Sequence, residues 1–111
     1  MPAPSLHDDG STVTLDLHGL RVDEALHVTQ ALVREAARRG RSTVRLIHGA
    51  STSSTLYRNR TIKHELESLL DTGAMKSFVT SVWKAEGHLL LSLTLSGTAD
   101  PTPIRPADIS R

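Results

Sequence analysis

Two histidines that each precede a glycine are the side chains of this sequence best suited to chemistry at neutral pH. His18 precedes Gly19, His48 precedes Gly49, and Asp16 stands two residues before the first histidine. Because an imidazole has an ordinary pKa of about 6.5, it can give or take a proton near neutrality, and a neighbouring carboxylate can fix its tautomer. The spacing therefore makes Asp16, His18 and His48 a candidate catalytic set. The alternative is that Asp16 hydrogen-bonds a loop and each histidine ends a strand.

A polar run directly after the second histidine could hold an anion. The hydroxyl groups of Ser51, Thr52 and Ser53 precede a segment with helical spacing. Such a helix would direct its first backbone N–H groups and the positive end of its dipole at the same spot. We therefore expect Gly49 and these hydroxyls to bind phosphate. A polar loop that only caps the helix is the alternative.

Basic side chains gather in the sequence around the same segment. A groove edged by them would contact backbone phosphates, whereas solvated surface charge is the alternative reading. The residues are Arg41, Arg45, Arg58, Arg60 and Lys63, of which Arg45, Arg58 and Arg60 are the predicted phosphate contacts.

The composition narrows the functional classes. The chain has 111 residues, no cysteine and a formal net charge of +1, so disulfides and thiolate metal sites are excluded and the charge alone does not indicate a polyanion partner. A divalent metal on Asp16, His18 and His48 would lack an evident fourth ligand, so we predict no cofactor. No apolar run approaches the roughly 18 residues of a membrane span, and no secretory h-region follows Met1. We expect a cytoplasmic domain with no membrane partner.

Hydrophobic periodicity predicts the elements that must position these residues. Val13, Leu15 and Leu17 alternate with polar residues, which is typical of a strand. Apolar residues with helical spacing begin at Val22. This predicted helix has acidic residues at its start and Arg38, Arg39 and Gly40 at its end. The remaining predicted elements are a β-branched strand over 43–47, a helix that ends near 71–73, and two hairpin strands over 77–84 and 88–95.

The predicted fold class is therefore α/β, an α+β two-layer sandwich in the order β-α-β-α-β-β. It has a four-stranded mixed sheet and two helices over residues 12–96, with flexible tails at 1–11 and 97–111. A crossover helix between the first two strands makes them parallel. Since ligands bind at the carboxyl ends of parallel strands, we expect His18 and His48 to line one cleft.

Two segments resemble motifs of a known family. Residues 15–20, Leu-Asp-Leu-His-Gly-Leu, followed by Asp-Glu-Ala-Leu, look like the opening motif of Smr (small MutS-related) domains. Residues 44–49 resemble the strand that leads to that family's second motif, His-Gly-x-Gly. The resemblance covers about residues 13–95. Asp16 and His18 match the first motif, and His48 and Gly49 match the start of the second.

The resemblance implies a fold like the C-terminal domain of translation initiation factor 3, and an activity of nicking DNA or cleaving RNA. Ser51 stands where the family usually has the second glycine of its second motif, which alters a loop that could approach phosphate closely. The leading hypothesis is an endonuclease in which the histidines exchange protons and Arg58 or Arg60 holds phosphate. A binding module without catalysis and a protein-interaction domain are the alternatives.

Overall fold

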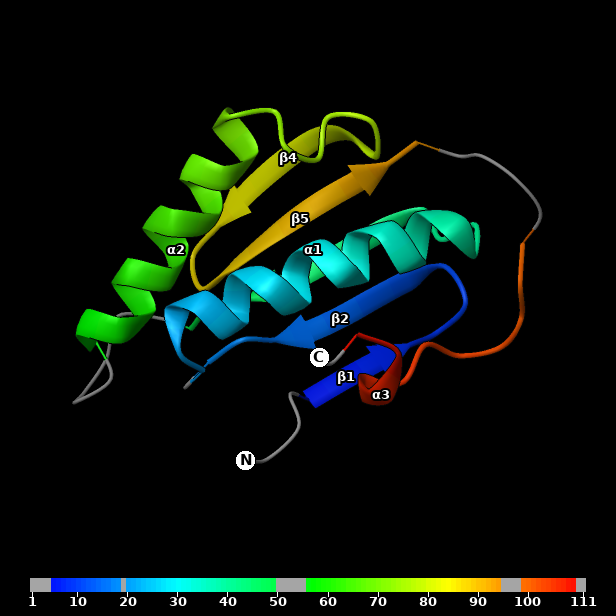
Figure 1. Cartoon of the computed structure of the whole chain (residues 1–111), viewed down its shortest axis with the longest axis horizontal. Coiled ribbons are helices and arrows are strands. Elements are labelled where there is room, and N and C mark those ends of the chain that lie inside the picture. Colours follow the sequence, from blue (N-terminus) through cyan, green and yellow to red (C-terminus); the bar gives the residue numbers. More distant parts are fainter. Residues whose placement is uncertain (1–4, 19, 50–55, 95–98, 110–111) are drawn as a thin grey trace.

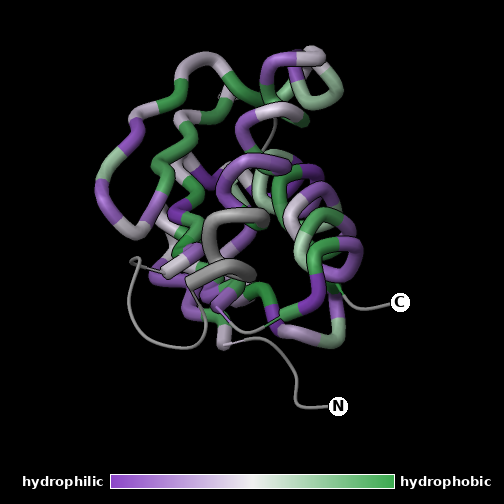
Figure 2. Tube along the Cα trace, turned by 90° about the vertical axis from the view of Figure 1, so that its left-hand side faces the viewer, coloured by the Kyte–Doolittle hydropathy of each residue, from purple (hydrophilic) through white to green (hydrophobic). Residues whose placement is uncertain are grey.

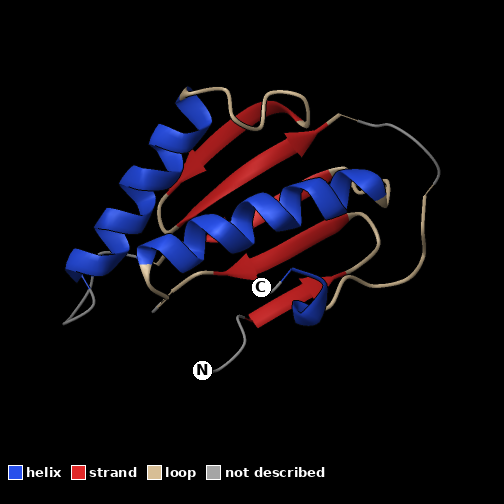
Figure 3. Cartoon of the chain, in the orientation of Figure 1, coloured by secondary structure: helices blue, strands red, loops and turns tan. Residues whose placement is uncertain are grey.

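The computed structural model describes residues 5–18, 20–49, 56–94 and 99–109, and for residues 56–61 it describes the backbone alone. These residues form a five-stranded mixed sheet in the order β1-β2-β3-β5-β4, with three helices (Figures 1 and 3). The elements are β1 (Ser5–Asp8), β2 (Thr12–Asp16), α1 (Val22–Arg38), β3 (Thr43–Ile47), α2 (Leu56–Asp71), β4 (Val79–Ala85), β5 (His88–Leu93) and α3 (Pro106–Ile109).

The central strands follow the predicted plan. β2 and β3 are parallel, with Leu15 opposite Leu46, and β5 pairs antiparallel with both β3 and β4. The predicted fold class, with its mixed sheet, two long helices and final hairpin, is therefore confirmed. The sheet has one strand more than expected, and a short third helix follows it.

Helices α1 and α2 both cover one face of the sheet, whereas no described helix lies across the other face (Figures 1 and 3). Every second residue of β2, β3 and β5 is buried against these helices, which places a single aliphatic core between the two layers. Burial of each such side chain stabilises the fold by about 1.5 to 3 kcal/mol. Core residues with no exposed surface include Val13, Leu15, Leu32, Val33, Val44, Leu46, Ile62, Leu66, Leu89 and Leu91.

Helix α1 forms for the reasons that its sequence predicts. Asp23 and Glu24 lie in its first turn and Arg38 in its last, which complements the helix dipole. Figure 2 shows hydrophobic and hydrophilic segments alternating around its axis. After the helix, Gly40 adopts a φ of +78°, a left-handed conformation that glycine tolerates best.

The expectation of flexible tails was wrong for the described parts of both segments. Ser5–Asp8 forms β1, an edge strand paired antiparallel with β2, and Pro106–Ile109 forms α3 against α1. Ile104 and Ile109 are buried. Neither segment has hydrophobic periodicity of its own, so neither was predicted. Polar contacts between residues far apart in the sequence help to hold both segments in place.

The main polar contact is a buried ion pair between Arg41 and Asp8. Arg41 Nε donates to Asp8 Oδ1 at 2.8 Å, and the two side chains are 1% and 0% exposed. Arg41 also donates to the carbonyl oxygens of Asp100 and Thr102, while the Ile104 N–H donates to Asp8. Its place in the basic cluster predicted that Arg41 would lie at the edge of a phosphate groove. That prediction was wrong, because the Arg41 side chain is buried in this ion pair. It joins both ends of the described chain to the sheet.

Candidate functional site

The carboxyl ends of β2 and β3 lie side by side because the two strands are parallel. Asp16 stands opposite Ile47 in the register, and the Leu17 N–H donates to the Ile47 carbonyl oxygen at 2.7 Å. His18 and His48 follow directly. The structure thus places both histidines at the same edge of the sheet, which is where ligands bind in open α/β sheets.

Asp16 shapes the turn that carries His18. Its Oδ1 accepts a hydrogen bond from the backbone N–H of His18 at 2.9 Å, a contact typical of an Asx turn. The His18 side chain is exposed and makes no hydrogen bond with the Asp16 carboxylate. The structure therefore matches the alternative in which the aspartate binds a loop, and not the one in which it orients this imidazole.

Asp16 and His48 lie on opposite faces of the sheet. Since side chains alternate along a strand, Asp16 and its partner Ile47 leave the face opposite the helices. His48 comes one residue later, is 2% exposed, and lies on the same face as Val44 and Leu46. The carboxylate therefore does not reach the buried imidazole, and the three predicted catalytic residues do not converge.

The imidazole of His48 is held in one defined tautomer. Its Nδ1–H donates to the Gly49 carbonyl oxygen at 3.1 Å, because a carbonyl can only accept. Burial lowers its pKa, opposed by this hydrogen bond, and nearby Lys63 lowers it further while Glu67 counteracts that effect. His48 is thus neutral near pH 7. Its Nε2 lone pair is buried without a partner in the described part of the chain.

The turn between β4 and β5 closes over the end of β3. The backbone N–H groups of His48 and Gly49 both donate to the Gly87 carbonyl oxygen, at 3.0 and 3.1 Å. Gly49 has a φ of +94°, a conformation that L side chains rarely adopt. In this conformation neither N–H is free for the phosphate that we expected Gly49 to bind. Gly87 was expected only as part of the hairpin turn before the last strand, with no role for its carbonyl oxygen at the site.

The other predicted phosphate contacts divide into two groups. Arg45 is exposed and lies on the sheet face opposite the helices. Ser51, Thr52 and Ser53 fall outside the described residues, and Arg58 and Arg60 lie on α2 where only the backbone is described.

Two charged residues of α2 that affect the buried imidazole were not part of the predicted catalytic set. Lys63 and Glu67, one helical turn apart, both act on the His48 pKa. Glu67 also pairs with Lys84 of β4 at 3.6 Å. The spacing of four between Lys63 and Glu67 was the signal that could have placed them on one helix face.

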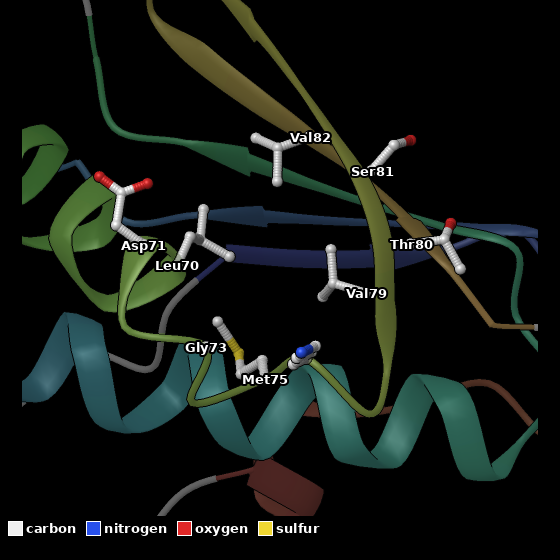
Figure 4. Close-up of a pocket in the computed structure, with 9 residues that line it drawn as sticks. Leu70, Asp71, Gly73, Met75, Val79, Thr80, Ser81 and Val82 are labelled. Carbon is white, nitrogen blue, oxygen red and sulfur yellow. The ribbon is translucent and has the colours of Figure 1, made fainter.

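Other concave or ionisable features carry less chemistry. A pocket of about 300 Å³ lies between the end of α2 and β4, where Leu70, Met75, Val79 and Val82 point toward a common space (Figure 4). Within residues 5–18, 20–49, 62–94 and 99–109, no three histidine or acidic side chains gather closely enough to hold a metal ion. None of the described helices is both long and apolar enough to cross a bilayer.

Comparison with known protein families places most of the chain in one of them. The family model for the Smr domain matches residues 15–91, which is more than half of the 111 residues. Searches of curated proteins and of solved structures gave no match. The matched range runs from β2 to β5 and contains both histidine-bearing strand ends.

Proposed function

This chain belongs to the Smr domain family, which supports a domain that acts on nucleic acid, and from that premise we propose that it binds nucleic acid at the strand-end edge. The strand-end edge consists of His18, His48, Gly49 and the α2 residue Lys63. The observation that carries the proposal is the parallel pairing of β2 with β3, which brings the exposed His18 beside the second motif. Neighbouring strand ends of this kind are common ligand sites.

Binding fits this geometry better than cleavage does. General acid–base catalysis needs its groups within hydrogen-bond reach of the reacting atoms. His48 is buried, His18 is exposed, and Asp16 is committed to the backbone. The exposed Lys63 places a cation at the edge, which is consistent with a contact to a backbone phosphate. We keep Ser51, Thr52, Ser53, Arg58 and Arg60 as proposed phosphate contacts, since they follow the second motif in the sequence.

Oligonucleotide binding tests this proposal directly. Fluorescence anisotropy of labelled single-stranded and duplex RNA and DNA, titrated with the full chain, should show saturable binding. The combined variant His18→Ala/Lys63→Ala should bind more weakly, and Glu65→Ala, a change on α2 outside the edge, should bind as the wild type does. Absence of binding to every probe, with the fold intact by circular dichroism, would refute the proposed function.

A second candidate function is RNA cleavage, and it is favoured by the Nε2 of His48, which has no hydrogen-bond partner among the described residues. A neutral imidazole with a free lone pair can accept the proton of a 2′-hydroxyl, whose oxygen then attacks the adjacent phosphorus. His18, in its protonated form, would donate a proton to the departing 5′-oxygen. This route requires the substrate to reach an imidazole that is buried in the present conformation.

Cleavage assays separate the two candidates. If the chain is an RNase of this kind, it should cut RNA but not the matched oligonucleotide with a 2′-deoxy linkage, in buffers with and without EDTA. His48→Ala should abolish cutting, whereas Glu65→Ala, a change outside the edge, should cut as the wild type does. Cleavage that survives in the His18→Ala/His48→Ala double variant would rule out these histidines as the reacting groups.

A further inference from the structure

The sheet face opposite the helices carries the single tryptophan of the chain. Trp83 of β4 is 62% exposed. Its two strand neighbours fix its direction, because Val82 lines the pocket beside α2 and Lys84 pairs with Glu67 of α2. Since alternate residues leave opposite faces, Trp83 faces away from the helices.

The neighbours of Trp83 on this face form a short row across three strands. Trp83 stands opposite Leu90 of β5, and Leu90 stands opposite Arg45 of β3. The indole also meets the His88 ring edge-on, with centroids 6.4 Å apart and an interplanar angle of 61°. Two strand spacings place the Trp83 and Arg45 positions about 10 Å apart. The exposed Trp83 ring and the exposed Arg45 side chain therefore lie on the same face, with Leu90 between them.

Apart from Ile47, the rest of this face is polar and nearly free of negative charge. Asp16 is the one carboxylate at the open-face positions of β2, β3 and β5, and its Oδ1 is occupied by the His18 N–H. A stable protein interface is built on a contiguous apolar core, which this face lacks. On these three strands the open-face positions are Thr12, Thr14, Asp16, Thr43, Arg45, Ile47, His88, Leu90 and Ser92.

We propose that Trp83, His88, Leu90 and Arg45, termed the open-face platform, bind single-stranded nucleic acid. A base stacks on the Trp83 indole, and the Arg45 guanidinium contacts a backbone phosphate of the same strand. Base stacking on aromatic side chains of a sheet is open to any sequence, because every base has a π face. The inference rests on the proposed nucleic-acid binding and adds a surface separate from the strand-end edge, with a preference for unpaired bases.

The single tryptophan allows stacking to be observed directly. Trp83 fluorescence of the full chain is titrated with an unlabelled single-stranded oligoribonucleotide and with a duplex of the same sequence. Labelled versions of both probes report total binding by anisotropy in parallel. We expect the single strand to quench Trp83 saturably with the same midpoint as the anisotropy, and the duplex to quench it much less.

Matched variants on the two sides of β4 separate the platform from general effects. Trp83→Ala should weaken single-strand binding about tenfold or more, because stacking of one base is typically worth that factor. Trp83→Phe should retain most of the affinity, and Arg45→Ala should weaken binding and reduce its salt dependence. Val82→Ala changes the adjacent residue on the opposite face and should bind as the wild type does.

Each other outcome overturns the inference in a recognisable way. Anisotropy that shows binding without quenching, together with unchanged affinity of Trp83→Ala, removes the platform and leaves the strand-end proposal standing. Equal quenching by duplex and single strand refutes the preference for unpaired bases. A Trp83 signal that changes with protein concentration alone, with dimers seen by light scattering, means that a second copy covers this face. No binding at all refutes both proposals.

Discussion

Asp16 and His48 lie on opposite faces of the sheet, although the strands that carry them are adjacent and parallel. The two residues differ by one in register, because Asp16 is level with Ile47. A shift of one residue reverses the direction of a side chain in a strand. This separation divides the candidate catalytic set.

The Asp16 carboxylate should matter for stability and little for proton transfer. Asp16→Ala removes the acceptor of the His18 N–H and should lower the free energy of unfolding by about 1 kcal/mol. Asp16→Asn keeps an oxygen acceptor and should cost much less. Urea unfolding of the three proteins measures this. A loss of oligonucleotide binding in Asp16→Asn without loss of stability would instead show that the negative charge itself is needed.

Buried His48 should make the fold less stable in mild acid. Its folded pKa lies below the ordinary value of 6.5 because of burial, so the unfolded chain takes up the proton first as the pH falls. The free energy of unfolding should therefore decrease as the pH falls below about 6.5, and the decrease should end below the folded pKa. His48→Gln does not titrate and should show a flatter profile between about pH 7 and 5.

Urea midpoints measured across this range for both proteins give the comparison. The difference between wild type and His48→Gln removes the contribution of the other histidines. Parallel profiles for the two proteins would contradict a depressed His48 pKa.

Two glycines in similar conformations should respond differently to alanine. Gly40 and Gly73 have φ values of +78° and +80°, so each alanine bears a similar backbone cost of about 1 to 2 kcal/mol. A Cβ on Gly40 would lie 2.9 Å from the Ala99 Cα, whereas a Cβ on Gly73 would meet nothing nearer than the Lys76 Cβ at 3.9 Å. Gly40→Ala should therefore cost about 1 to 3 kcal/mol more. Equal unfolding free energies for the two variants would mean that the segment at Ala99 does not pack there.

The Arg41–Asp8 pair should be the most sensitive polar contact of the fold. Arg41→Met leaves the Asp8 carboxylate buried without its cation and should cost about 3 to 5 kcal/mol. The double variant Asp8→Asn/Arg41→Met should recover part of the loss, because no unpaired charge is left. Arg38→Met, which breaks an exposed pair with Glu35, is the control and should leave the urea midpoint nearly unchanged.

The central fold was predictable because its signals are local. Alternation in Val13, Leu15 and Leu17, and the acid-first, base-last pattern of α1, each follow from side chains within one element. β1 and α3 were missed because residues 33 to 96 positions apart hold them, through Arg41, Asp8 and the backbone N–H of Ile104. The residue pattern within either segment gives no sign of such long-range contacts.

The candidate site was predictable in place but not in direction. Parallel pairing correctly indicated that His18 and His48 would follow neighbouring strand ends at one edge of the sheet. Alternation from Asp16 correctly set its face, but the relative register of β2 and β3 decides which residues share a side, and it depends on core packing. The role of the open face was not predicted either. β4 is exposed along most of its length, so its sequence shows no alternation, and Trp83 is an ordinary residue for a strand.

Salt dependence of binding tests the central claim, contact with nucleic-acid phosphates, most directly. Anisotropy titrations of a single-stranded oligonucleotide at salt concentrations from about 50 to 200 mM give the slope of log K against log salt. For two or more phosphate contacts at about −0.7 each, the predicted slope is about −1.4 or steeper. Affinity that does not change with salt would contradict phosphate contacts and, with them, the proposed nucleic-acid binding.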